Sequence, residues 1–345
     1  MITSGRFNAF FAASLTTITA LTASAALVLS AGPGLAQPSA RSTVRGAPET
    51  VVEAVQMPAW VERDTDKIAL APGMALRDRD RVRTGDNARI VLRMPEGSTV
   101  KLGEKGSLLL DNMRMQRKEN VFAATMKVFE GAFRFTTNVL VKYRGRRQVE
   151  VTISAVTAGI RGTDLWGKAA PDRDIVCLIE GIVEVRRGAD PPFTMDQPLM
   201  FYIAPKDKPP LPVAPVPKKQ IEQWAAETEI QAGRGAARRG GKWKVVLATM
   251  DTQQEALKIY DAVRAAGYAA EIRPHDAAGK HTYDVRLAQL PSKAEAQALA
   301  DSLRGKIDTL SAHLQERVKK VGNNADPAAS MATLRPVLAE AQELG

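Results

Sequence analysis

The segment 157–167, TAGIRGTDLWG, combines three glycines with one arginine and one aspartate. Such a stretch could be a catalytic loop, a phosphate cradle or a structural corner. A phosphate cradle needs a helix N-terminus directly after the glycines, because the free N–H groups there bind the anion. The following residues, LWGKAAPDRD, predict no helix. The sequence therefore favours a corner in which Gly159 and Gly162 allow tight geometry, while Arg161 and Asp164 brace the turn or pair with neighbouring strands.

Two other polar groups could in principle bind a metal or exchange protons. His275, Asp276 and His281 flank one expected turn, but no cysteine or second carboxylate stands near them to complete a ligand set. Three aspartates within residues 78–86 have no evident acid or base partner. The chain also lacks G-x-S-x-G, H-E-x-x-H and a P-loop. We therefore expect no enzyme activity, no cofactor and no metal.

Cys177 is the only cysteine of the chain, so an intramolecular disulfide is impossible. It lies in the strand-like run DIVCLIEGIVEV, where a small buried side chain fits. We expect a core residue rather than a reactive thiol.

Residues 1–36 have the pattern of a secretory signal peptide. Arg6 is the only charge before a long apolar run, and Gly34 and Ala36 place small residues at a cleavage site before Gln37. The run is long for a signal peptide, so an uncleaved membrane anchor is the alternative. Cleavage is favoured because no basic stop-transfer cluster follows. No other segment has about 18 consecutive apolar residues, so none is expected to span a membrane after cleavage.

The formal net charge is +10, and loss of Arg6 with the signal leaves +10 − 1 = +9. A basic exported protein suggests an anionic partner, such as a cell-wall polymer or a membrane surface. Export argues against nucleic acid as the partner.

Residues 51–204 consist of short apolar runs punctuated by Gly, Asp and Pro. The runs are VVEAVQ, RIVLRM, STVKLG, SLLLDN, AFRFTT, EVTISAV, DIVCLIEGIVEV and MFYIAP. In AFRFTT, Phe133 and Phe135 share one face and Arg134 takes the other. This pattern predicts an all-β domain after a disordered lead-in over residues 37–50.

Residues 205–242 are predicted to link two domains. PKDKPPLPVAPVPKK is a Pro-rich, extended stretch. IEQWAAETEIQA predicts a short helix, and GRGAARRGGK a flexible basic spacer. At the other end of the chain, residues 321–345 form an alanine-rich tail whose sequence indicates no particular structure or function.

Residues 243–320 contain a duplicated strand–turn–helix unit. VVLATMDTQQEA and VRLAQLPSKAEA align at an offset of 40 residues. Thr252 and Ser292 are hydroxyl N-caps, each followed three residues later by glutamate, so both helices begin with a capping box. Gly267 and Gly305 stand where helix ends favour glycine, and YAAEIR supplies a strand between the copies.

Both helices must cover the same face of this sheet, which leaves the other face open. Strand alternation assigns the following residues to the helix side: Val245, Leu247, Tyr283, Val285 and Leu287. It assigns Ala248 to the open face. With this parity Trp243 and Tyr283 point away from that face, and a shift by one residue would bring them onto it. The candidate binding residues are Lys244, Val246, Thr249, Arg273, Thr282, Asp284 and Arg286. The alternative is a solvated face with ordinary cross-strand pairs.

This repeat resembles the SPOR domain. WKVVLATMDTQQEA, AAGYAAEIR and TYDVRLAQLPSKAEA follow that family's order of strand, [ST]xxEA helix and two further strands. The resemblance implies an α+β fold of RNP-like βαββαβ type that binds peptidoglycan glycan strands, typically denuded strands at division sites. The sequence departs from the family pattern at Val246, Ala248, Ala288 and Gln289, on the side expected to face the glycan.

The front half resembles a FecR domain. RDRVRTGDNARIVLRMPEGSTVKLGEKGSLLL, FEGAFRF, TAGIRGTDLWG and CLIEGIVEVR match that family's segments in order between residues 80 and 187. The resemblance implies an all-β module, sandwich or rolled, that is structural or sensory rather than catalytic. It makes one structural turn motif of Gly159, Arg161, Gly162, Thr163 and Asp164.

Together the resemblances imply a non-enzymatic, exported cell-envelope protein of the periplasm. Its SPOR-like domain would bind peptidoglycan, and its FecR-like domain a ligand or another envelope protein. The alternative is a membrane-anchored periplasmic sensor of FecR type. Only six residues precede Phe7, so no cytoplasmic anti-sigma region is expected, which argues against that alternative.

Overall fold

The computed structural model describes residues 49–116, 118–137, 145–160, 162–277, 279–304 and 341–343. The predicted signal peptide, nearly all of the lead-in and most of the tail lie outside these residues, as do Arg161 and Gly305. Residues Gly46–Gly345 form one compact unit, which contains both the β-rich front half and the α+β region.

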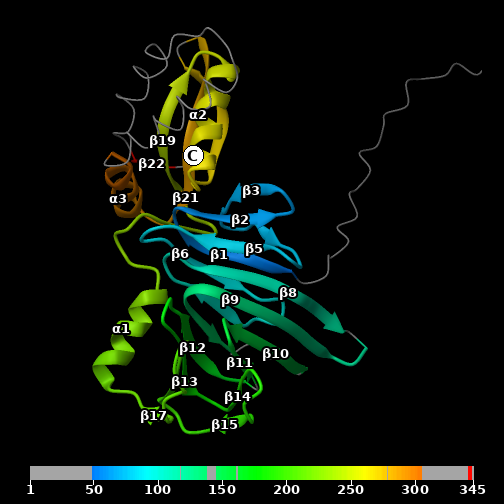
Figure 1. Ribbon diagram of the computed structural model, residues 1–345. Coiled ribbons are helices and arrows are strands. Elements are labelled where there is room, and N and C mark those ends of the chain that lie inside the picture. The colour runs from blue at the N-terminus through cyan, green and yellow to red at the C-terminus, as the bar shows by residue number, and fades with distance from the viewer. Residues whose placement is uncertain are drawn as a thin grey trace, which may run out of the picture. The chain divides into compact units, whose positions relative to one another are not determined.

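The front half is all-β, as predicted, and its strands form two sheets (Figure 1). Sheet A contains β1 (Thr50–Gln56), β4 (Ala75–Leu76), β6 (Arg89–Arg93), β7 (Thr99–Leu102), β12 (Asp164–Ala169), β13 (Arg173–Glu180), β16 (Met200–Pro205), β17 (Ala214–Pro215) and β18 (Ala236–Arg238). Sheet B contains β2 (Ala59–Arg63), β3 (Asp66–Ala69), β5 (Arg81–Thr84), β8 (Ser107–Gln116), β10 (Arg146–Ile153), β11 (Val156–Ile160), β14 (Val183–Arg187) and β15 (Phe193–Met195).

One long strand, β9 (Val121–Thr136), belongs to both sheets. Its first half pairs with β8 and, in parallel, with β10. Its second half, from Gly131, pairs with β7 and β12. Gly131 has φ +84°, and a Cβ there would lie 2.7 Å from the Cα of Gly106. Glycine is therefore required where the chain passes from one sheet to the other.

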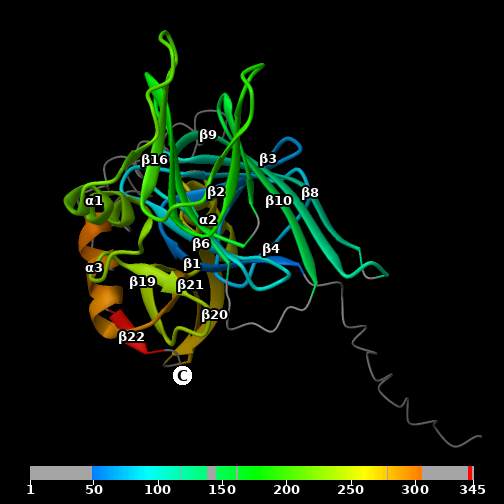
Figure 2. The same ribbon diagram turned by 90° about the horizontal axis from the view of Figure 1, so that it is seen from below.

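The core of the front half lies between the inward faces of the two sheets. It includes the fully buried rings of Phe122, Phe133 and Phe135, while Arg134 is only partly buried. The predicted alternation along AFRFTT is thus confirmed. Both views show β8, β9 and β10 extending together from this body (Figures 1 and 2).

The Pro-rich segment lies along sheet A, which differs from the predicted linker. The Leu211 N–H donates to the Ile203 carbonyl at 2.9 Å, and the Val216 N–H donates to the Leu199 carbonyl at 2.8 Å. Strand β17 pairs with β16. These backbone hydrogen bonds attach the segment to the sheet, so it is not a free spacer.

Helix α1 (Lys218–Thr228) then packs against sheet A (Figure 1). The ring of Trp224 stacks on that of Trp166, with centroids 4.7 Å apart and planes inclined by 9°. Phe201 meets Trp224 edge-on. The predicted short helix is present, and its one large aromatic residue attaches it to the front half.

The basic segment 233–242 also differs from the predicted flexible spacer, because it contains β18. In this strand Ala236, Ala237 and Arg238 pair antiparallel with the last residues of β1. The carboxylate of Glu295 accepts hydrogen bonds from the N–H groups of Gly233 at 2.7 Å, Gly235 at 2.7 Å and Ala236 at 3.2 Å. The segment is thus held from both sides.

The C-terminal region has the βαββαβ order that the resemblance implies, but its last strand lies within the predicted tail (321–345) and not within residues 243–320. It consists of β19 (Trp243–Met250), α2 (Gln253–Ala265), β20 (Ala270–Ala277), β21 (Lys280–Leu290), α3 (Lys293–Arg304) and β22 (Ala341–Glu343). Its sheet, sheet C, has the strand order β20-β21-β19-β22. Apolar side chains of α2 and α3, including Ile259, Val263 and Leu299, pack against Val245 and Val285 of the sheet.

The two predicted N-caps are present, but the two capping glutamates behave differently. The Thr252 hydroxyl accepts from the Glu255 N–H and donates to the Glu255 carboxylate at 2.8 Å. The Ser292 hydroxyl accepts from the Glu295 N–H at 3.2 Å, while the Glu295 carboxylate binds the segment before β18. Gly267 has φ +89° just after α2, as predicted for a helix end.

Substitution Glu295→Gln should loosen the segment before β18. The variant loses the charge that strengthens three backbone hydrogen bonds, so local opening should become easier by about 1–2 kcal/mol. Hydrogen exchange should then accelerate about tenfold at the amides of Gly235 and Ala236. Glu255→Gln is the matched control, because that carboxylate bonds only within its own helix cap. Equal exchange in both variants would contradict the role of Glu295.

Candidate functional site

The structure brings the predicted binding residues onto one face of sheet C, opposite α2 and α3. Arg273 on β20 lies across from Asp284 on β21. Asp284 in turn lies across from Thr249 on β19, and Arg286 across from Val246. We call this face the platform; it comprises Lys244, Val246, Thr249, Glu271, Arg273, Thr282, Asp284 and Arg286.

A β-bulge at Leu247 corrects the predicted position of Ala248. Val246 pairs with Arg286, but the next paired residue on β19 is Ala248, opposite Val285. One extra residue on β19 reverses its alternation. Ala248 is therefore buried on the helix side with Val285, and Thr249 takes the place on the platform.

Ion pairs and one hydrogen bond connect the side chains of the platform. The Arg286 Nε donates to Glu271 at 2.7 Å, and the Arg273 guanidinium donates to the same carboxylate at 3.3 Å. The Thr249 hydroxyl donates to Asp284 at 2.7 Å. Sequence reasoning missed Glu271, although its spacing of two residues from Arg273 places it on the same face. Glu271 therefore pairs with both arginines, of which Arg273 is 60% exposed and Arg286 only 16%.

Two predicted binding residues offer little side-chain surface. Val246 is 6% exposed and Thr282 is 9% exposed. The Thr282 hydroxyl donates to the carbonyl of His275. Trp243 and Tyr283 pack against the helix-side core, as the predicted parity requires. The platform is therefore polar and charged, with Arg273 as its most accessible arginine at 60% side-chain exposure.

At the far end of β20 and β21, His281 pairs with Asp276 rather than with His275. The His281 Nδ1 lies 2.6 Å from the Asp276 carboxylate, and its ring meets Tyr283 edge-on. Within the described parts of the chain, no three His, Cys, Asp or Glu side chains gather as a metal-ligand group.

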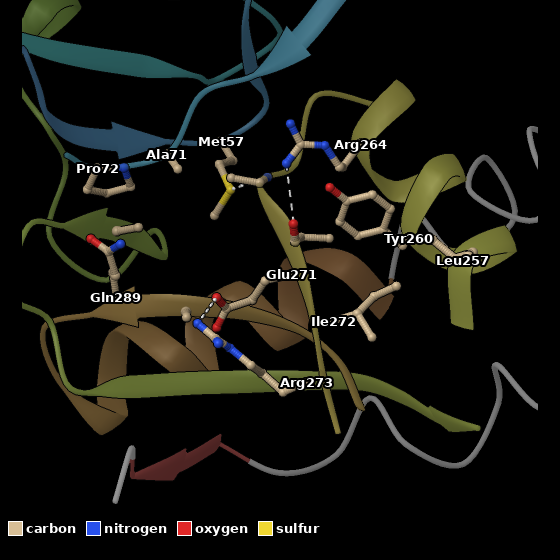
Figure 3. A pocket seen from close by; sticks show the side chains of 14 residues that line it. Met57, Ala71, Pro72, Leu257, Tyr260, Arg264, Glu271, Ile272, Arg273 and Gln289 are labelled. Atoms are coloured by element: carbon tan, nitrogen blue, oxygen red, sulfur yellow. Dashed lines mark hydrogen bonds and ion pairs between the residues drawn. The ribbon is translucent and has the colours of Figure 1, made fainter. Parts of the chain in front are cut away.

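A cavity of about 560 Å³ adjoins the platform at β20. Figure 3 shows its lining: Leu257, Tyr260 and Arg264 come from α2, and Glu271, Ile272 and Arg273 from β20. Met57, Ala71 and Pro72 from the front half line it too. We call this cavity the junction pocket, because both halves of the chain form it.

Direct contacts hold the two halves together beside this pocket. The Ala59 N–H donates to the Gly267 carbonyl at 2.9 Å, and the Lys67 ammonium donates to the Ala265 carbonyl at 2.9 Å. Lys67 thereby caps the C-terminus of α2, where a positive charge is favourable. A Cβ at Gly267 would lie 3.1 Å from Pro58, so glycine also permits this close approach.

A second cavity, of about 770 Å³, lies on the front half and contains several cations. Lys168 pairs with Glu227 at 2.8 Å and Lys105 with Asp86 at 3.2 Å. Arg89 donates to backbone carbonyls, and burial lowers the pKa of its guanidinium. Lys168, Lys105 and Arg89 thus have partners, while Lys206 also lines the cavity.

The TAGIRGTDLWG segment forms a corner between β11 and β12. Asp164 accepts two hydrogen bonds from Arg134 on β9, at 2.8 and 2.7 Å. This pairing raises the pKa of the Arg134 guanidinium. Arg134 also contacts Glu229, which follows α1 and pairs with Lys101 as well. Asp164 therefore joins neighbouring strands, and Arg161 of the same motif lies outside the described residues.

The glycines of this corner have different roles. Gly162 has φ +78°, and its carbonyl oxygen would be only 2.5 Å from a Cβ at Gly181. Thr163, which is buried, exchanges hydrogen bonds with Thr137 at the end of β9. Gly159 has no positive φ, and a Cβ there would meet neighbours only at 3.8 Å. The expectation of special backbone geometry therefore holds for Gly162 and fails for Gly159.

Comparisons with known proteins agree with this architecture. The model of the family described as FecR protein matches residues 80–184. The model of the SPOR domain matches residues 239–312. The chain contains a FecR domain followed by a SPOR domain. Both are non-catalytic binding or regulatory modules typical of cell-envelope proteins, and the SPOR domain supports peptidoglycan binding.

Other comparisons add less. A search among curated proteins finds no match. Two crystal structures of a "putative anti-sigma factor" from Parabacteroides distasonis align with 58% of this chain and 96% of their own, at 12% identity and a TM-score of 0.34. None of the helices within the described ranges is long and apolar enough to cross a membrane.

Cys177 should be unreactive in the native protein. It is 1% exposed, and burial raises the pKa of its thiol to about 12, so the reactive thiolate is scarce at pH 8. We expect a thiol reagent such as DTNB to label the protein only in denaturant. The Thr249→Cys variant, with a second thiol on the exposed platform, should react at one site without denaturant. Rapid labelling of the native wild-type chain would contradict the buried position.

Proposed function

We propose that the protein is an exported, non-enzymatic envelope protein whose SPOR domain binds peptidoglycan glycan strands through the platform. The observation that carries this proposal is a sheet face that α2 and α3 leave uncovered among the described residues that match the SPOR domain. The sheet offers an extended polar surface, and a glycan strand is an extended chain of hydroxyl and amide groups. Arginine provides several donors for such oxygens.

The electrostatics of the platform support the same ligand. Its formal charges are positive at Lys244, Arg273 and Arg286 and negative at Glu271 and Asp284, so 3 − 2 = +1. Amidase cleavage of a stem peptide leaves a lactyl carboxylate on the glycan, so a denuded strand carries negative charges at regular intervals. The absence of the bulky stem also allows the strand to lie close to the sheet. We therefore propose denuded strands, as expected at division sites, as the preferred form.

The FecR domain is proposed to bind a ligand or another envelope protein while the SPOR domain holds the chain on the wall. This arrangement would place the FecR domain in the periplasm, close to peptidoglycan. The alternative is a membrane-anchored sensor held by an uncleaved N-terminal segment.

Arg273→Ala should weaken binding of the chain, without residues 1–36, to purified sacculi. Arg273 is exposed and contributes charged donors, so loss of about 1 kcal/mol should lower the affinity roughly fivefold. The measurement is co-sedimentation with sacculi before and after amidase treatment, and treated sacculi should pellet more wild-type protein. Lys293→Ala is the control, because it removes the same charge from the start of α3.

Each other result of this experiment has a definite meaning. Equal pelleting with treated and untreated sacculi would refute the preference for denuded strands. No pelleting with either would refute glycan binding. An unchanged Arg273→Ala variant would move the binding surface away from β20.

Export with cleavage predicts a mature chain that begins at Gln37. Sequencing the N-terminus of the protein recovered from the periplasmic fraction of its host would test this. Recovery of Met1 in the membrane fraction would instead support the anchored sensor.

A further inference from the structure

The junction pocket lies against an edge strand. In the described part of sheet C, β20 pairs with β21 on one side only. An edge strand carries unpaired N–H and C=O groups that can template another strand. Proteins usually cover such edges or prevent their pairing. The residues around β20 therefore indicate which of its backbone groups another strand could still reach.

Pro274 shows which residues of β20 face outward. It lies opposite Tyr283 on β21 and has no N–H to donate, so its position must be one whose polar groups point away from β21. Since such positions alternate in an antiparallel pair, Ala270 and Ile272 also face outward. Arg264 supports this register, because it donates to the Ala270 carbonyl at 3.4 Å.

The outward groups of Ile272 therefore open into the junction pocket. Residues 269–273 line it without interruption, and Met57, Ala71 and Pro72 form the facing wall. Pro274 blunts the edge beyond the pocket, and Arg264 already occupies the Ala270 carbonyl. One short stretch of the edge, centred on Ile272, is thus unpaired among the described residues, and the wall formed by Met57, Ala71 and Pro72 faces it (Figure 3).

The two sides of the pocket differ in chemistry. Towards α2 the lining is apolar, with Leu257, Tyr260 and Ile272, and Leu257 is 41% exposed. Towards the platform it is charged, with Arg273 and Glu271. Glu271 is shared between Arg273 and Arg286, so the positive charge is in excess. A strand added to β20 would direct alternate side chains to these two sides.

We propose that the junction pocket binds an extended peptide segment of another protein, which adds as a strand to β20 at Ile272. The segment alternates apolar side chains, directed towards Leu257 and Tyr260, with acidic side chains directed towards Arg273. Main-chain hydrogen bonds give such binding its affinity, and the alternating sides give it selectivity. This site does not depend on glycan binding, although Arg273 contributes to both surfaces.

The test uses a fluorescein-labelled, capped hexapeptide in which aspartate and valine alternate. Its binding to the chain without residues 1–36 is followed by fluorescence anisotropy. We expect saturable binding to the wild-type chain. The peptide methylated at alternate backbone nitrogens should bind at least tenfold more weakly, because it cannot pair with β20. A peptide of the same composition with its aspartates and valines in separate blocks should also bind more weakly.

Variants on both walls locate the site. Ile272→Pro removes an outward N–H without removing a hydrogen bond to β21 and should weaken binding at least tenfold, whereas Ile272→Val keeps the N–H and should bind normally. Ala71→Trp fills the pocket from the FecR side and should also abolish binding. Circular dichroism and sacculus pelleting check that these variants fold. Absence of peptide binding, or full binding by folded Ile272→Pro, would overturn the proposal, whatever the result with sacculi.

Discussion

The pairing of β18 with the end of β1 is the constraint on which the arrangement of the two domains depends. It joins Ala54 on β1, next to the border of sheet A, to Arg238, directly before the residues that match the SPOR domain. Because the intervening chain has already crossed sheet A as α1, this pairing closes a long loop. Closing a loop costs conformational entropy. Three contacts within the loop offset this cost: the stacking of Trp224 on Trp166, the Lys101–Glu229 ion pair and the Lys168–Glu227 ion pair.

Further contacts beside β18 join the SPOR domain to the FecR side of the chain. The carbonyls of Gly267 and Ala265 accept hydrogen bonds from the front half, and the Glu295 carboxylate binds the segment before β18. These contacts hold the two domains together as the β18–β1 pairing does. The platform, in contrast, depends mainly on sheet C itself, through the bulge at Leu247 and the sharing of Glu271. Sheet C thus sets the geometry of the platform, whereas β18 and the contacts beside it set how the SPOR domain is attached to the front half.

The sequence was informative where a pattern is local. Alternation revealed most strands of the front half, and cap residues such as Thr252 and Ser292 revealed the helices. The sequence was misleading for residues 205–242. Their proline-rich and basic composition is typical of a spacer, and the residues that they contact lie far away in the chain. Gln56, for example, accepts from the N–H of Gln231. The bulge at Leu247 was also invisible, since several consecutive apolar residues on β19 fit either parity. The Arg134–Asp164 pair needed the register of β9 and β12.

The prolines laid along sheet A have a consequence for how copies of the chain meet. Sheet A would otherwise end at β16, whose run MFYIAP is rich in apolar residues. Instead β17, with Pro215 in the strand and Pro217 just after it, occupies that border. A proline-bearing border is a poor template for intermolecular β-pairing. The segment that joins the two domains thereby also acts as a guard against aggregation.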